Sequence, residues 1–266
     1  MATRVVVGRS LSIGRVFNRA FATIGANPVL AFGLALLFYA VPVALSDYAM
    51  QNVQRTLIGG TSDMYGYMAV SLAAFVAGLA ISFMFQAVAQ AAIVSSFIVD
   101  RDGDRPAFGG AIGPFMRRFL PLVVVSLICS IGFTIGFALL FVPYILLWVR
   151  WIVAPAVVVA EGKGLVDAFR RSALLTRGAR WAILGLNLIV MIISTMFIVV
   201  AGIAIYAVAG RPPPNLAAMR PAELAMSMIA YTLVGAFMAA IQAALYAELR
   251  DWKTGPSTGN LAEIFR

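Results

Sequence analysis

Long apolar stretches fill the chain between Ala26 and Leu249, and they constrain its fold more than any other feature. A helix needs about 20 mostly apolar residues to cross the hydrocarbon core of a bilayer. The composition agrees, because 62% of the residues are hydrophobic and 12% are charged, whereas a soluble domain carries about 25% charged residues. The sequence therefore predicts an all-α protein, a polytopic membrane helical bundle.

Hydropathy and helix-breaking residues predict six transmembrane helices. The stretch from Phe119 to Ala160 is too long for one span, so we divide it at Val142-Pro143, where proline would break a helix. The predicted spans are residues 27–46, 67–99, 119–141, 143–160, 181–209 and 224–249. No segment outside them is long enough to bury its own core. We therefore expect a single integral membrane domain over residues 1–266, ending in a cytoplasmic tail at 250–266.

The distribution of basic residues predicts the orientation. An even number of spans puts both termini on one side of the membrane, and most lysines and arginines fall in segments on that side. The loops on the other side contain only Arg55, Arg211 and Arg220. Because cytoplasmic segments carry an excess of Lys and Arg, both termini are expected in the cytoplasm. The net charge of +9 then reflects orientation, and we expect no nucleic-acid partner.

A short segment with helical periodicity precedes each pair of spans, at about residues 10–25, 106–118 and 164–177. In each segment the apolar residues follow one stripe of a helix. The stripes are Ile13, Val16, Phe17, Ala20, Phe21 and Ile24, then Phe108, Ala111, Ile112, Phe115, Met116 and Phe119, and more faintly Leu165, Ala168, Phe169, Ser172, Ala173 and Thr176. In this register Phe17 corresponds to Phe169 and Arg19 to Arg171, while Pro114 weakens the second copy.

Helices of this kind normally lie in the headgroup layer with their apolar side toward the lipid tails. The sequence therefore predicts three interfacial amphipathic helices, one before each hairpin. They could grip or sense lipid as a collar. Alternatively, they only anchor the ends of loops against anionic lipid, where each arginine contributes about 1 kcal/mol near the surface.

Arg150 falls within the fourth predicted span. Counted along an unbroken helix it lies about 16 Å from Glu161, near mid-membrane. A charge there costs at least about 2.5–3.5 kcal/mol unless it is paired or hydrated. Arg150 therefore meets an anionic group such as a lipid phosphate, or bonds to amides and carbonyls while Trp148 or Trp151 covers its stem. A third option is that the segment is shallow and Arg150 reaches the surface.

Four amides form a candidate intramembrane polar cluster: Gln86, Gln90, Asn187 and Gln242. Gln86 and Gln90 are four residues apart and share a helix face. Such amides commonly make helix–helix hydrogen bonds of modest energy. They could instead line a polar path together with Arg150.

The residue types that the chain lacks exclude several kinds of catalytic and metal-binding site. The chain has no histidine and a single cysteine, Cys129. An internal disulfide is excluded, and so are the commonest general base, most zinc sites and every histidine-dependent triad. We therefore predict a non-enzymatic protein with no catalytic residue, no metal site and no cofactor.

Several motifs in the second half of the chain resemble a known family. They are Ala154-Pro155-Ala156-Val157-Val158-Val159-Ala160-Glu161-Gly162, Ala168-Phe169-Arg170-Arg171-Ser172, Leu175-Thr176-Arg177-Gly178, Tyr246-Ala247-Glu248-Leu249-Arg250 and Leu261-Ala262-Glu263-Ile264-Phe265. They look like the stand-alone bacterial form of the membrane domain associated with glycerophosphoryl diester phosphodiesterases. In that family the chemistry belongs to a soluble domain that uses histidines and metal-binding acids. The resemblance thus implies a bacterial inner-membrane location and transfers no catalytic residue.

The sequence therefore predicts a protein that binds, organises or moves membrane lipid, or that scaffolds an envelope enzyme. The candidate lipid or anion contacts are Arg150, Arg170, Arg171 and Arg177. The expected partners are membrane lipids, anionic ones above all, with a second membrane protein or another copy of the chain as a further option. The alternative is a small transporter or channel whose polar path surrounds Arg150.

Overall fold

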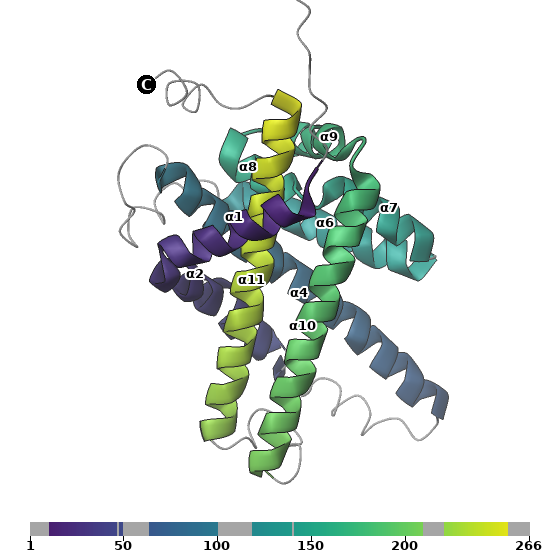
Figure 1. Ribbon diagram of the computed structural model, residues 1–266. Coiled ribbons are helices and arrows are strands. Elements are labelled where there is room, and N and C mark those ends of the chain that lie inside the picture. Colours follow the sequence, from purple (N-terminus) through teal and green to yellow (C-terminus); the bar gives the residue numbers. More distant parts are fainter. Residues whose placement is uncertain are drawn as a thin grey trace, which may run out of the picture.

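Every element that the computed structural model describes is a helix, which confirms the all-α prediction (Figure 1). The described residues are 11–46, 48–49, 64–100, 119–139, 141–209 and 221–254. In chain order the helices are α1 (Ile13–Ala26), α2 (Pro28–Ala35), the π-helix η1 (Leu36–Ala40), α4 (Met64–Asp100), α6 (Phe119–Leu139), α7 (Phe141–Trp151), α8 (Ala154–Glu161), α9 (Leu165–Thr176), α10 (Arg180–Ala209) and α11 (Pro221–Thr254).

Four helical stretches in the described part of the chain are long and apolar enough to cross a membrane: Pro28–Ser46, Tyr144–Glu161, Arg180–Ala207 and Pro221–Lys253. They match the first, fourth, fifth and sixth predicted spans, and the chain is a membrane protein. The second and third predicted spans lie in α4 and α6. Within the residues that the structure describes, these two helices include the shorter apolar stretches Met64–Gly78, Met84–Ile93 and Phe119–Phe133. A total of six spans therefore stays a prediction.

The fourth predicted span consists of two helices. α6 ends at Leu139 and α7 begins at Phe141, so Pro143 lies in the first turn of α7, where its missing N–H needs no acceptor. A turn at Ile152 and Val153 then separates α7 from α8, and Pro155 again lies in a first turn. Because of this turn, a count along one unbroken helix does not give the depth of Arg150.

α1 buries the middle of the stripe that its periodicity predicted, and it does so against the protein. Val16 and Ala20 are fully buried and Phe17 packs on the core. The Phe17 and Phe21 rings lie 6.2 and 6.0 Å from that of Phe237 on α11, and Figure 1 shows α1 lying across α11. The expectation that this stripe faces lipid is therefore wrong for Val16, Phe17 and Ala20, which other helices of the same chain cover, whereas Phe21 remains 57% exposed.

α9 is a second helix in the described part of the chain that, like α1, buries one side against the protein and leaves the other side exposed. We call α1 and α9 one-sided helices. Ala168, Ser172 and Thr176 of the predicted stripe are fully buried, and Phe169 packs on the core. The segment predicted at 106–118 lies outside the described residues, as does the tail from residue 255 onward. α8 and α9 lie at the same end of the molecule as the last turns of α11, while α10 and α11 extend toward the other end (Figure 1).

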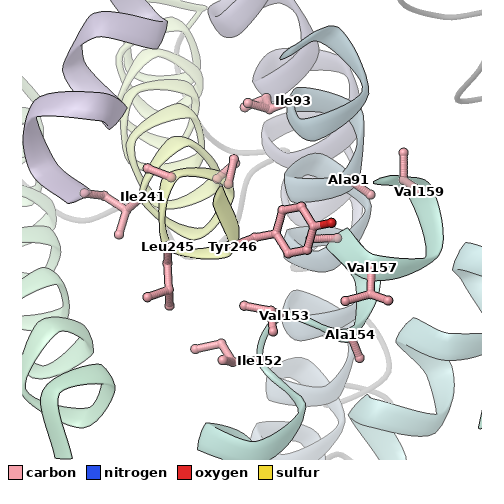
Figure 2. Close-up of a cluster of buried hydrophobic side chains, with 14 of the residues drawn as sticks. Ala91, Ile93, Ile152, Val153, Ala154, Val157, Val159, Ile241, Leu245 and Tyr246 are labelled. Carbon is pink, nitrogen blue, oxygen red and sulfur yellow. The ribbon is translucent and has the colours of Figure 1, made fainter. Parts of the chain in front are cut away.

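The core gathers around α11. Figure 2 shows Ile241, Leu245 and Tyr246 of this helix beside Ala91 and Ile93 of α4 and the buried side chains of α8. Small residues on α11 let the neighbouring backbones approach closely. These include Ala236, Ala239, Ala240, Ala243 and Ala244, all of which are buried. This packing fixes the end of the bundle where the charged residues of α1, α8, α9 and α11 meet.

Candidate functional site

Arg171 forms an ion pair with Glu161. Its Nε lies 3.1 and 3.2 Å from the two carboxylate oxygens of Glu161, the last residue of α8. Lys163 Nζ lies 3.1 Å from the same carboxylate, and the Tyr246 hydroxyl donates to it at 3.3 Å. Glu161 therefore ties α8 to α9 and α11, and Arg171 is committed to a structural contact.

A second cluster of the same kind joins α1 to α11. Arg15 Nε lies 2.6 Å from Oε1 of Glu248, and Arg19 Nη1 lies 3.5 Å from its Oε2. Arg19 also lies 2.9 Å from Asp251. The Glu248 side chain is only 6% exposed, and a carboxylate this buried is costly unless cations and hydrogen bonds compensate it. The two arginines of α1 supply that compensation.

Arg150 lies in the last turn of α7, and its side chain is exposed. Its backbone carbonyl accepts a 2.8 Å hydrogen bond from the hydroxyl of Ser172 on α9. The Trp151 ring lies 4.9 Å from that of Phe169, so aromatic side chains fill the junction between α7 and α9. Tryptophan is enriched at membrane–water interfaces. These contacts place Arg150 at the junction between α7 and α9 and leave its side chain exposed.

Arg170 and Arg177 also point outward. Arg170 is exposed on α9, and Arg177 is exposed at the C-terminal cap of the same helix. Within the described part of the chain, no carboxylate pairs with Arg150, Arg170 or Arg177. Of the four arginines predicted to contact anions, the structure thus leaves three exposed around α9 and ties the fourth to Glu161.

Two members of the predicted amide cluster meet. Gln242 Nε2 donates to Asn187 Oδ1 at 2.8 Å, joining α11 to α10, and Asn187 Nδ2 donates to the Ile183 carbonyl at 2.8 Å. Both residues are buried. Both amide atoms of Gln86 and Oε1 of Gln242 are buried without a hydrogen-bond partner among the described residues. The side chain of Gln90 lies outside them, and no described contact joins Arg150 to these amides.

From the sequence, Glu161 served only as a depth marker, and the ion pairs of Glu248 with Arg15 and Arg19 were not predicted. The sequence does contain a weak signal for these two ion-paired glutamates. Each glutamate follows an alanine and precedes a basic residue by two positions, in Ala160-Glu161-Gly162-Lys163 and Ala247-Glu248-Leu249-Arg250. Among the described residues, no three acidic or cysteine side chains come close enough together to hold a metal ion.

A protein family described as a domain of unknown function (DUF7847) matches residues 11–249, which include both glutamate clusters and α9. The chain belongs to this family. No curated protein and no solved structure matches it. The family match gives no support to the membrane domain of glycerophosphoryl diester phosphodiesterases in particular, so that resemblance assigns no activity.

Proposed function

We propose that this protein is a non-enzymatic bacterial inner-membrane protein that binds the phosphate groups of anionic lipid. The observation that carries the proposal is the division among the arginines of α9 and its neighbour α7. Arg150, Arg170 and Arg177 are exposed without an acid partner in the described chain, whereas Arg171 is paired with Glu161. Lipid binding at the exposed arginines would organise or move lipid at this end of the bundle.

Charge and geometry support a phosphate ligand. A guanidinium group presents several donors in a planar fork that matches phosphate oxygens. Each arginine near an anionic leaflet contributes about 1 kcal/mol of attraction. Lys163 and Arg171 already neutralise Glu161, so this carboxylate repels an incoming phosphate only weakly. The excess of basic residues in the segments at this end favours the cytoplasmic leaflet, with both termini in the cytoplasm.

The resemblance to the membrane domain of glycerophosphoryl diester phosphodiesterases fits the same setting. A lipid-binding membrane domain of that kind could scaffold an envelope enzyme, with the chemistry on the partner. We retain this as a variant of the proposal, in which the arginines hold lipid beside a second membrane protein or another copy of the chain.

Native mass spectrometry of protein extracted gently from its own membrane tests the proposal. The variant with Arg150→Gln, Arg170→Gln and Arg177→Gln is compared with Lys253→Gln, a control at an exposed basic residue in the last turn of α11. Wild-type protein and Lys253→Gln should retain a phospholipid of defined mass, and the triple variant should lose most of it. Equal retention by the triple variant and the wild type would overturn the proposal.

The buried amides favour a second candidate, a small transporter or channel. Gln86 and Gln242 hold buried polar atoms without partners in the described chain, and such atoms in a membrane protein can line a solute path. Proteoliposomes loaded with potassium chloride test for ion conduction. Ion flux above that of empty vesicles, lost in Gln242→Leu, would favour a channel, while flux equal to that of empty vesicles would count against it.

A further inference from the structure

The contacts of α1 and α9 match at four positions, although Arg15 corresponds to Asp167 and has no counterpart on α9. In the register that pairs Phe17 with Phe169, the fully buried positions Val16 and Ala20 of α1 correspond to the fully buried Ala168 and Ser172 of α9. The same register pairs Arg19 with Arg171. Both arginines contact a glutamate, Glu248 for Arg19 and Glu161 for Arg171. Burial and ion pairing thus repeat together.

The two glutamates also have matching surroundings. Glu161 ends α8 and Glu248 lies near the end of α11, each within the pattern Ala-Glu-any-basic. Both helices belong to candidate membrane spans. The Tyr246 hydroxyl on α11 reaches Glu161, so the two carboxylates belong to one end of the bundle. Each one-sided helix therefore meets the acid-bearing end of a span.

The order along the chain differs between the two contacts. α9 follows α8 directly, through a turn in which Gly162 adopts a positive φ of 64°. α1 comes first in the chain but contacts α11, the last described helix, through an ion pair that spans 233 positions. Relative to α11, α1 thus occupies the place that α9 occupies relative to α8.

We propose that the two contacts are copies of one latch, in which arginine on a one-sided helix pins that helix across the acid-bearing end of a span. α1 then docks on α11 as though it followed α11 in the chain, so that the first and last described helices close the bundle. This device is separate from the proposed lipid binding, because it uses Arg15, Arg19 and Arg171 and leaves Arg150, Arg170 and Arg177 exposed.

The latch has a physical task that apolar packing does not perform. Apolar burial is non-directional, so a stripe alone lets a helix slide or rotate across its neighbour with little penalty. A buried carboxylate that needs a cation specifies one register, because any other position leaves it unpaired. The arginine side chains stay partly exposed, at 47% for Arg15, 41% for Arg19 and 24% for Arg171, and the glutamate side chains are less exposed, at 6% for Glu248 and 17% for Glu161.

Cross-linking of two cysteine pairs, each in its own variant protein, tests the latch. In a Cys129→Ala background, cysteines at Phe21 and Phe237 report docking of α1, because these rings lie 6.0 Å apart. Cysteines at Trp151 and Phe169, whose rings lie 4.9 Å apart, report docking of α9 in a separate protein. A short bifunctional thiol reagent joins each pair, and peptide mass spectrometry measures the rate.

Glu248→Gln should slow the α1 cross-link several-fold and leave the α9 cross-link unchanged. Glu161→Gln should do the reverse. The unaffected pair shows in each case that the bundle is still folded. The proposal is overturned if a glutamine variant leaves its own pair at the wild-type rate, because apolar packing alone then holds the helix. It is also overturned if each variant slows both pairs equally, because the carboxylates then support the whole bundle.

Discussion

α10 and α11 pack side by side, and both are candidate membrane spans, but their surroundings are opposite. In the apolar stretch of α10 only 11% of the residues are buried within the protein, against 50% in that of α11. α10 is nevertheless the more apolar of the two. In a protein folded in water the more apolar helix would be expected to be the more buried one, because burial is what removes apolar surface from water.

The difference shows that apolar character and packing are separate properties in this protein. Lipid tails are as apolar as leucine, so a membrane helix gains little from burying apolar surface against another helix. α10 exposes large side chains such as Met196, Val200 and Ile203, whereas α11 buries a run of alanines that let its neighbours approach. Small residues and shape therefore decide which helix becomes the centre of the bundle.

Removing a large buried side chain from α11 should have the largest effect. Leu245 is fully buried and Ile198 on α10 is 45% exposed. Leu245→Ala should destabilise the protein by about 2–5 kcal/mol because it leaves a cavity, and Ile198→Ala by far less. Cys129 is the only cysteine and is buried, so heat unfolding can be followed by its labelling with a fluorogenic maleimide. Equal shifts in the two variants would mean that α10 packs as tightly as α11.

A methyl group added to each helix gives the next largest contrast. A Cβ at Gly235 of α11 would overlap the ring of Tyr39 in η1, whereas one at Gly202 of α10 would meet nothing within 4 Å. Gly235→Ala should cost about 1–3 kcal/mol through overpacking. Gly202→Ala should be neutral or stabilise by up to about 1 kcal/mol through helix propensity. The same thiol-labelling measurement compares the stability of the two variants. If Gly235→Ala left the stability unchanged, Tyr39 would have to move aside freely.

The hydrogen bond between the two helices should contribute less. Gln242→Leu leaves Oδ1 of Asn187 without its donor, and such bonds in membrane proteins average about 0.6 kcal/mol with a maximum of about 1.7. Adding Asn187→Leu should recover part of the loss, because replacing both partners removes the unpaired group. A double-mutant cycle on unfolding stability measures the coupling. Additive losses would mean that the two amides do not interact.

The smallest effect is expected at Ser194. This residue is buried on α10, and its hydroxyl has no hydrogen-bond partner among the described residues. Ser194→Ala should change stability by less than about 0.5 kcal/mol or stabilise slightly, since no bond is lost. A loss above about 1 kcal/mol in the labelling assay would show that the hydroxyl is bonded and that this part of α10 packs specifically.

Periodicity predicted which residues of α1 share a face, but not what covers that face. The stripe through Val16, Phe17 and Ala20 was placed against lipid, and the structure places it against α11 and the core. A hydrophobic stripe has the same pattern whether lipid or protein covers it, because both are apolar. The helix itself and its buried side could therefore be predicted, and its partner could not.

A turn beside Arg150 shows what tertiary contacts add to local sequence. Pro143 and Pro155 are both compatible with a helix start, since either can occupy a first turn. The predicted division lies only at Pro143, whereas the structure adds a turn at Ile152 and Val153, just before Pro155. That turn and the hydrogen bond from Ser172 place Arg150 beside α9. Local sequence identifies candidate breaks, but tertiary contacts select among them.

The sequence by itself determined that this is an all-helical membrane protein, because its apolar stretches match the thickness of a bilayer and nearly all its charge lies outside them. It also singled out the arginines, but not their roles. Arg170 and Arg171 are neighbours in the chain, and only the fold points one outward and the other at Glu161. The ion pair between Arg15 and Glu248 joins opposite ends of the chain. Ion pairs depend on distances of a few ångströms, and only the folded structure determines those distances.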